Sequence, residues 1–362
     1  YGGDINTPAY SFYANATCWR GLNDTALAFR TLGRQDEARR YQQAADGYRQ
    51  RLLALTDRIA DHSGKLAFLP MSFEIGASHD YREREPAYDF LGINAPASNA
   101  WLYLGNYWNL FAPMMLEVKL FDASDARSRW IPDYMDARGG ILAGLVRFTL
   151  GLDQIYGKGY YESLLEQGKR EEFLTSLYGI FAHGASQNLY SFPEVAGIFP
   201  LRVSNAAMWR EHQRNLWNWY FQWGWGFEGW QNCEGEPLSA GPGMALQMLR
   251  MALVREATET PQQDTLRLLD GAPAHWFEPG KRIVVRDAPT FFGKISFETE
   301  GTTSGVRARV TRPAGFSARQ IILCTPRALR SVSIDGKDWS NFTGQEITLP
   351  RGESLEVVAT FQ

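Results

Sequence analysis

The stretch from Tyr156 to Pro200, YGKGYYESLLEQGKREEFLTSLYGIFAHGASQNLYSFPEVAGIFP, changes character near its middle. In its first part apolar residues recur at three- and four-residue spacing, at Phe173, Leu174, Leu177, Ile180 and Phe181. This spacing predicts a helix with one face against a core, ending near Gly184. From Gly184 to Pro200 we expect an aromatic loop on a helical scaffold, and binding residues are commonly found on such loops.

Glu194 is the single carboxylate of this loop. It follows Pro193, whose fixed φ restricts the loop, and Asn188, Tyr190 and Phe192 can line a cavity beside it. These features make Glu194 a candidate catalytic residue. The alternative is a solvated surface glutamate without a catalytic role.

Length and composition set the limits for the rest of the chain. The 362 residues suggest about two domains. A net charge of −3 gives no electrostatic footprint for nucleic acid or an anionic membrane, and no run of about 18 apolar residues marks a membrane span. Aromatic residues reach 14%, which suits stacking on sugar rings and equally suits the filling of helical cores.

The three cysteines, Cys18, Cys233 and Cys324, are far apart and lack any C-x-x-C spacing. A zinc site or redox motif is therefore not expected, and the sequence indicates no metal and no cofactor. Cysteine usage leaves the compartment open, and we favour a secreted or periplasmic location over a cytoplasmic one.

The first 60 residues predict a helical hairpin. The Gly-rich segment YGGDINTPAY places Asp4 just before a helix that starts near Pro8, a residue favoured in the first helical turn. We expect Ala14, Cys18, Leu22, Ala26 and Phe29 to form its buried face. Asp36 can cap a second helix, whose expected stripe is Ala38, Tyr41, Ala45, Tyr48, Leu52, Leu55 and Ile59.

Residues 62–96 break the helical pattern with Gly, Pro and several acidic residues, among them Glu74, Asp80 and Asp89. Long insertions of this kind are commonly functional loops, although mixed charges usually mark a solvated surface. Helical spacing returns over 98–120 and 131–135, and Gly139-Gly140 opens a further segment. We expect residues up to about 260 to be almost entirely helical.

Six of the twelve tryptophans lie between Trp209 and Trp230. Trp223, Trp225 and Glu228 in this Gly-interrupted segment are candidate sugar-binding residues, together with Glu74, Asn188 and Tyr190. Local packing of the tryptophans is the alternative. A last helix is expected over roughly 243–255.

Near Thr258 to Asp264 the composition becomes polar, which is typical of a linker. Beyond Leu268 short β-branched runs alternate with Gly, Pro and Asp turns. About seven such runs predict a small antiparallel β-sandwich. We therefore expect a helical domain over 1–262, carrying the site, and a sandwich domain over 268–362.

Helical hairpins followed by a sandwich resemble the second half of a six-hairpin glycosidase, an (α/α)6 barrel, most closely of the α-L-rhamnosidase type. Two stretches carry the resemblance. Residues 2–52, from GGDINTPAYSFYANATCWRGLNDTALAFRT onward, are similar to the hairpin that follows a G-D loop in that barrel. Residues 268–297, LLDGAPAHWFEPGKRIVVRDAPTFFGKISF, are similar to the crossing from barrel to sandwich.

The resemblance implies inverting hydrolysis of a glycosidic bond in a polysaccharide or oligosaccharide, with one carboxylic acid and one carboxylate base. By its place in the order of elements, Glu194 matches the general base, and Asp4 is the next catalytic candidate, as a sugar-hydroxyl ligand or part of the acid machinery. Because a glutamate in an aromatic pocket would have the raised pKa that a general acid needs, the two roles could be exchanged. The chain departs from the family pattern in lacking an Asp-Glu-Arg-x-Gly-Trp cluster, where that family keeps its general acid.

The helices expected here are also fewer than a closed barrel of six hairpins requires. The resemblance thus implies that an N-terminal portion of the same polypeptide, or a second chain, completes the barrel.

Two other functions stay open at this point. The first is a polysaccharide lyase, in which His183, Asn188, Tyr190 and Arg210 would abstract a proton and neutralise a uronate. The second is a non-catalytic glycan-binding protein on a degenerate barrel, which the missing acid cluster favours.

Overall fold

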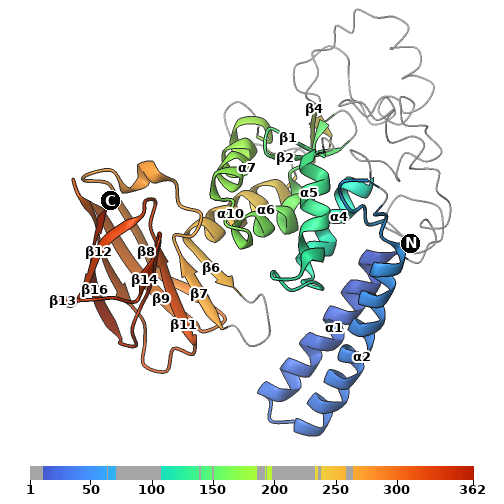
Figure 1. The fold of residues 1–362 in the computed structure, drawn as a ribbon, viewed down its shortest axis with the longest axis horizontal. Coiled ribbons are helices and arrows are strands. Elements are labelled where there is room, and N and C mark those ends of the chain that lie inside the picture. Colours follow the sequence, from blue (N-terminus) through green and yellow to red (C-terminus); the bar gives the residue numbers. More distant parts are fainter. Residues whose placement is uncertain are drawn as a thin grey trace, which may run out of the picture. The chain divides into compact units, whose positions relative to one another are not determined.

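The computed structural model shows a chain of two compact units (Figure 1). The first comprises residues 1–164 and 175–245, and the second comprises residues 165–174 and 246–362. The structure describes residues 11–62, 64–70, 107–137, 140–148, 151–185, 192, 194–197, 233–234, 238–257 and 264–362.

Two antiparallel helices, α1 (Phe12–Thr31) and α2 (Gln35–Ile59), form a hairpin in the first unit (Figure 1). The hydroxyl of Ser11 caps α1 by accepting from the backbone N–H of Ala14 at 3.4 Å. Gly33, at a φ of 75°, makes the tight connection, a conformation that glycine adopts without steric cost. The predicted hairpin is confirmed.

The buried face of α1 differs from the predicted one. Ala14 and Cys18 are exposed, and the buried side chains are Phe12, Ala16, Trp19 and Ala26. Small residues satisfy helical spacing on either face, whereas Trp19 has a large area to remove from water and therefore sets the face.

On α2 three of the predicted residues, Ala38, Ala45 and Leu52, are buried. Asp36 does not cap this helix, because Arg34 occupies the N-cap position and Asp36 lies in the first turn. There its carboxylate still meets the positive end of the helix dipole.

Further helices and 3-10 turns follow, of which residues 165–174 belong to the second unit. Their bounds are α4 (Tyr107–Glu117), η4 (Ala126–Arg129), α5 (Trp130–Ala137), η5 (Ile155–Gly157), α6 (Lys158–Glu166) and α7 (Arg170–His183). Helix α7 ends immediately before Gly184, and Phe173, Leu174, Leu177 and Ile180 are buried as predicted.

The expectation that residues before 260 are almost entirely helical is wrong. Five short strands, β1 (Ile141–Leu142), β2 (Leu145–Phe148), β3 (Gly151–Leu152), β4 (Val195–Gly197) and β5 (Cys233–Glu234), form an antiparallel sheet in that order. Ala143 and Gly144 both take positive φ, of 53° and 79°, which is the two-residue turn that joins twisted strands. A side chain at Gly144 would meet the backbone of Ser176 at 2.6 Å, so the turn lies directly against α7.

The second unit follows α10 (Ala240–Leu253) and contains two sheets. The six-stranded sheet has the order β13-β12-β16-β10-β9-β8, and the five-stranded sheet has the order β14-β15-β11-β7-β6. The strands are β6 (Val254–Ala257), β7 (Thr265–Leu268), β8 (Arg282–Thr290), β9 (Gly293–Gly301), β10 (Gly305–Thr311), β11 (Gln320–Cys324), β12 (Leu329–Ile334), β13 (Lys337–Asp338), β14 (Phe342–Thr343), β15 (Glu346–Thr348) and β16 (Ser354–Phe361). One 3-10 turn, η7 (Ala274–Phe277), lies between β7 and β8.

The predicted strand runs are confirmed, with two differences. First, β7 and β11 pair in parallel, with Leu266 opposite Ile321, so the sandwich is not purely antiparallel. Second, β6 precedes the expected linker and pairs with β7, so this unit begins before residue 262. Strand β6 has the sequence VREA and directly follows an apolar helix. Its four residues therefore show no alternating pattern that would separate them from the helix.

The described residues contain no helix both long and apolar enough to cross a membrane.

Candidate functional site

Of the eight candidate site residues, only Glu194 lies among those that the structure describes. It is half-buried and directly precedes β4. The others lie outside the described residues: Asp4, Glu74, Asn188, Tyr190, Trp223, Trp225 and Glu228. The site is therefore considered from Glu194 outward.

Strand pairing places Glu194 at the end of β3. Gly151 pairs with Gly197 and Leu152 with Ala196, and the strands are antiparallel. Asp153 and Gln154 follow the last paired residue of β3, and Glu194 directly precedes β4. The residues just after β3 and the residue just before β4 therefore share one edge of the small sheet, although about 40 residues separate them in sequence.

Asp153 and Gln154 are buried polar residues at this edge, 1% and 0% exposed. The Asp153 carboxylate accepts a hydrogen bond from the backbone N–H of Ile155 at 3.1 Å. The backbone N–H of Asp153 donates to Val146 O at 2.8 Å. The Gln154 amide reaches Gly184 O, at 3.5 Å. These contacts link the end of β3 to the end of α7.

Tyr161 on α6 lies behind Gln154 and is fully buried. Its hydroxyl donates to Gln154 O at 3.4 Å. Burial, and secondarily the nearby charge of Asp153, raise the pKa of the Tyr161 phenol far above its usual range, so this group stays protonated. It is therefore a hydrogen-bond donor and not a base.

Both ends of the loop that carries Glu194 are fixed by packing. At its start Gly184 meets the Gln154 side chain, since an added Cβ would lie 3.1 Å from Gln154 Cδ. Near its end Phe192 is 7% exposed, its carbonyl accepts from Leu238 N at 2.8 Å, and its ring lies against Gly241. The expectation that Phe192 lines a cavity is thus wrong, because this ring packs on the start of α10.

A buried arginine lies on the neighbouring strand. Arg147 of β2 is 0% exposed and pairs with Leu152 of β3. Asn109 of α4 donates to the carbonyls of Arg147 at 2.6 Å and Gly140 at 2.5 Å, which fixes this strand to the helix. The sheet therefore holds a buried cation one strand away from the buried carboxylate of Asp153.

Sequence reasoning missed Arg147, Asp153 and Gln154. The available signal was the presence of these three polar residues in GLVRFTLGLDQIYG, a stretch composed mainly of apolar and turn residues. It could be recognised only if the segment was read as strands, whereas we expected helix.

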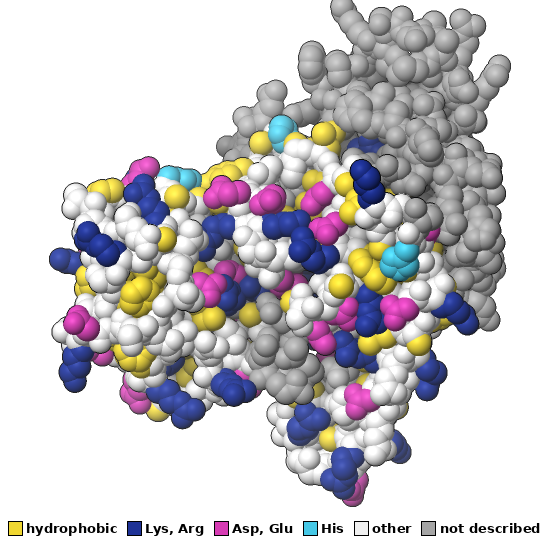
Figure 2. All heavy atoms as spheres, in the orientation of Figure 1, with side chains coloured by type: hydrophobic (Ala, Val, Ile, Leu, Met, Phe, Trp, Pro, Cys, Tyr) yellow, Lys and Arg dark blue, Asp and Glu magenta, His cyan; other side chains and the backbone are white. Residues whose placement is uncertain are grey.

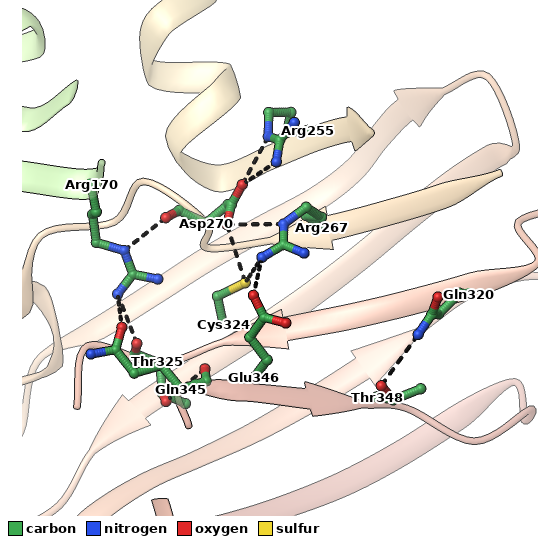
Figure 3. A network of polar contacts seen from close by, with 10 residues as sticks. All are labelled: Arg170, Arg255, Arg267, Asp270, Gln320, Cys324, Thr325, Gln345, Glu346 and Thr348. Carbon is green, nitrogen blue, oxygen red and sulfur yellow. Dashed lines mark hydrogen bonds and ion pairs between the residues drawn. The ribbon is translucent and has the colours of Figure 1, made fainter. Parts of the chain in front are cut away.

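A second buried polar cluster lies in the other unit, around Asp270 (Figure 3). Arg255 lies 2.6 Å from Asp270 Oδ2, and Arg267 Nε lies 3.0 Å from Oδ1. The Cys324 thiol donates to the same Oδ1 at 3.4 Å, and Arg267 also pairs with Glu346. Each charge here has an opposite partner, so the cluster is a structural ion network.

Burial would raise the pKa of Asp270, but the charges of Arg255 and Arg267 outweigh burial and hold that pKa below its usual range. Arg170, in the first turn of α7, donates to Asp270 O at 2.8 Å and to Thr325 O at 2.7 Å. The network thus joins the first turn of α7 to the residues that follow the ends of β7 and β11 (Figure 3).

Within the described part of the chain, no group of three or more His, Cys, Asp or Glu side chains could hold a metal ion. His183, a residue of the lyase alternative, is the last residue of α7 and is exposed.

Comparison with known proteins yields no sequence relative and a coarse structural likeness. No protein-family model matches the chain, and no curated protein sequence matches it. A solved structure of an alpha-L-rhamnosidase from Dictyoglumus thermophilum is similar over 94% of this chain and 31% of that chain, with a TM-score of 0.42 and 12% identity. The mixed helical and sheet architecture is compatible with this neighbour, and the closed barrel stays a prediction.

Proposed function

We propose that the chain belongs to a glycoside hydrolase, in which it forms part of an (α/α)6-type barrel and a β-sandwich. Its substrate would be an oligosaccharide or polysaccharide, cleaved with inversion in the manner of an α-L-rhamnosidase. An N-terminal portion of the same polypeptide, or a second chain, would complete the barrel.

The observation that supports this proposal best is the position of Glu194. It is half-buried, next to a proline, and at the sheet edge that also carries the buried Asp153 and Gln154. A general base must be fixed in place and still reachable by a water molecule. A half-buried carboxylate on a loop with both ends packed meets these two requirements.

In the proposed mechanism Glu194 removes a proton from the water that attacks the anomeric carbon. A carboxylic acid on the opposite face of the sugar protonates the leaving oxygen, and inverting enzymes hold the two carboxyl groups roughly 6.5–9.5 Å apart. Asp4 is our candidate for a second carboxylate or a sugar-hydroxyl ligand, and Glu74, Asn188, Tyr190, Trp223, Trp225 and Glu228 are candidate substrate contacts.

The test is product analysis combined with an isosteric variant. Glu194→Gln keeps the shape and removes the charge and the proton-accepting oxygen, so kcat should fall by about 10²–10⁴-fold with little change in binding. Glu353→Gln is the control, because Glu353 is an exposed carboxylate between β15 and β16. Its kcat should match that of the unmodified chain.

Three results would contradict the proposal in different ways. Products with the ultraviolet absorbance of an unsaturated uronate would identify a lyase. Glycan binding without any new reducing ends would identify a binding protein. If the Glu194→Gln chain released reducing ends at the full rate, the chain would still be a hydrolase, but Glu194 would not be its catalytic base.

A further inference from the structure

Helix α2 carries a row of arginines on one exposed face. Arg40, Arg51 and Arg58 are eleven and seven residues apart, which corresponds to about three and about two helical turns. They therefore lie along one line of the helix surface, separated by about 16 and about 10 Å. All three are exposed, and Lys and Arg side chains are prominent over this hairpin in Figure 2.

This row differs from four other arginines of the hairpin, which are paired with acids, whereas Arg30 donates to Gln42 at 3.3 Å. Arg20 pairs with Asp24 at 2.8 Å, and Arg34 with Glu37 at 2.5 Å. Arg39 pairs with Asp36, and Arg49 lies 3.2 Å from Asp122.

Within the part of the chain that the structure describes, no ion pair is formed by Arg40, Arg51 or Arg58. The positions between them on the same face are Gln43, Ala44, Gly47 and Ala54, none of which is acidic. The row is thus a set of cations that form no ion pair in the described hairpin, although the charge of Arg40 also acts on the carboxylate of Glu37.

Two of the three guanidinium groups are held over tyrosine rings. Arg40 lies 5.2 Å from the ring centre of Tyr41, and Arg51 lies 5.9 Å from that of Tyr48. Such cation–π contacts limit the freedom of the long side chains, and both residues remain exposed. Less entropy is then lost when a partner binds.

We propose that this arginine row, Arg40, Arg51 and Arg58, binds a linear polyanion of the uronic-acid polysaccharide class. Arg51 and Arg58 are about 10 Å apart along the helix axis, and Arg51 is held over Tyr48, on its side away from Arg58, so this arrangement does not converge on one small anion. In a polymer with a carboxylate on each sugar, a carboxylate comes close to every arginine even if the spacing of the sugars differs from the spacing of the arginines. Arginine suits such a partner because its fork pairs with a carboxylate through two parallel hydrogen bonds.

Nucleic acid is the other linear polyanion, and the surroundings of the tyrosines disfavour it. The ring of Tyr41 is contacted by Arg40 and by Phe29, and that of Tyr48 by Arg51, which limits the faces on which bases could stack. The inference names the substrate class of the proposed hydrolase, and in that respect rests on it.

The experiment measures equilibrium binding of the full chain, carrying Glu194→Gln so that turnover does not interfere. The probes are polygalacturonate, neutral dextran and single-stranded DNA at equal mass, at low and moderate salt. Polygalacturonate should bind and dextran should not. Binding should weaken as salt rises, because a higher salt concentration reduces the free-energy gain from counterion release and screens the charges.

The variant R40Q/R51Q/R58Q should bind polygalacturonate about tenfold more weakly, because exposed arginine–carboxylate contacts are individually small and add along the row. These are surface positions, so folding should be kept, and an unchanged circular dichroism spectrum checks it.

The matched control is R20Q/R34Q/R39Q, which removes the same charge from arginines already paired with acids. It should change the affinity by about twofold or less.

Equal losses in both triple variants would show that binding follows net charge, and would overturn the proposal. So would an absence of polygalacturonate binding, or tighter row-dependent binding of DNA. Because no assay here requires bond cleavage, the row can be confirmed or refuted even if the chain hydrolyses no glycan.

Discussion

Replacing Asp270 by asparagine tests whether the buried ion network stabilises the second unit. The side chains of Asp270 and Arg255 are only 6% and 3% exposed, with Arg255 Nε 2.8 Å from Asp270 Oδ2. Removing one partner of a buried pair typically costs about 3–5 kcal/mol, because the remaining charge stays buried without compensation. Since Arg267 keeps Glu346 as a partner, we expect the lower end, about 3 kcal/mol.

Amide hydrogen exchange measures this loss directly. The central strands β7 and β11 bury Leu266 and Leu323 at 0% and 1% exposure, so their amides exchange through opening of the unit. A loss of about 3 kcal/mol corresponds to exchange faster by about 10²-fold. Glu298→Gln is the control, because Glu298 pairs with Arg282 at an exposed site and should cost below about 1 kcal/mol.

The effect has a defined pH dependence. The folded pKa of Asp270 is lowered, so its stabilising contribution is full above the unfolded carboxyl pKa of about 3.9 and is lost as pH falls through the folded value. The difference between the two chains should thus be constant from about pH 5 to 7 and shrink below about pH 4. Exchange in the Asp270→Asn chain within twofold of the unmodified chain at pH 7 would refute this account of the network.

Three further expectations follow from particular residues. Gly159→Ala should destabilise the first unit by about 1–3 kcal/mol, since the added methyl overlaps the backbone of α4, whereas Gly21→Ala, with open space around it, should stabilise by about 0.5–1 kcal/mol; urea unfolding compares them. Trp223→Ala should weaken oligosaccharide binding by about 1–3 kcal/mol in titration calorimetry, and lost thermal stability with unchanged affinity would instead make it a core residue. Exposed Cys18 should react with a thiol reagent in the folded chain, while Cys324, whose pKa burial raises, should react only after unfolding; prompt modification of both would contradict the burial of Cys324.

Local sequence patterns were sufficient where one periodicity dominated a segment. The hairpin α1–α2, the end of α7 before Gly184, and the strands β8 to β13, β15 and β16 were predictable, whereas the two-residue strand β14 was not predicted. In each, apolar spacing and Gly or Pro punctuation agree, so local preference and tertiary packing favour the same structure. For the candidate site, the same reasoning selected Glu194 from a loop between two predicted elements, and its role stays a prediction.

Long-range pairing decided what the sequence could not. Strands β1 to β5 are two to four residues long, too short for an alternating pattern. They exist because β3 pairs with β4 (195–197), which in turn pairs with β5 (233–234). The pairing of β3 with β4 also sets Asp153 and Gln154, which follow β3, at the same end of this strand pair as Glu194, which precedes β4. Packing likewise decided which face of α1 is buried. Ala14 and Cys18 are small enough for either face, whereas burial of the large Trp19 side chain fixes the face that points to the core. Arg267 is only three residues from Asp270, but Arg255 reaches Asp270 from the neighbouring strand β6, a contact that depends on the pairing of β6 with β7.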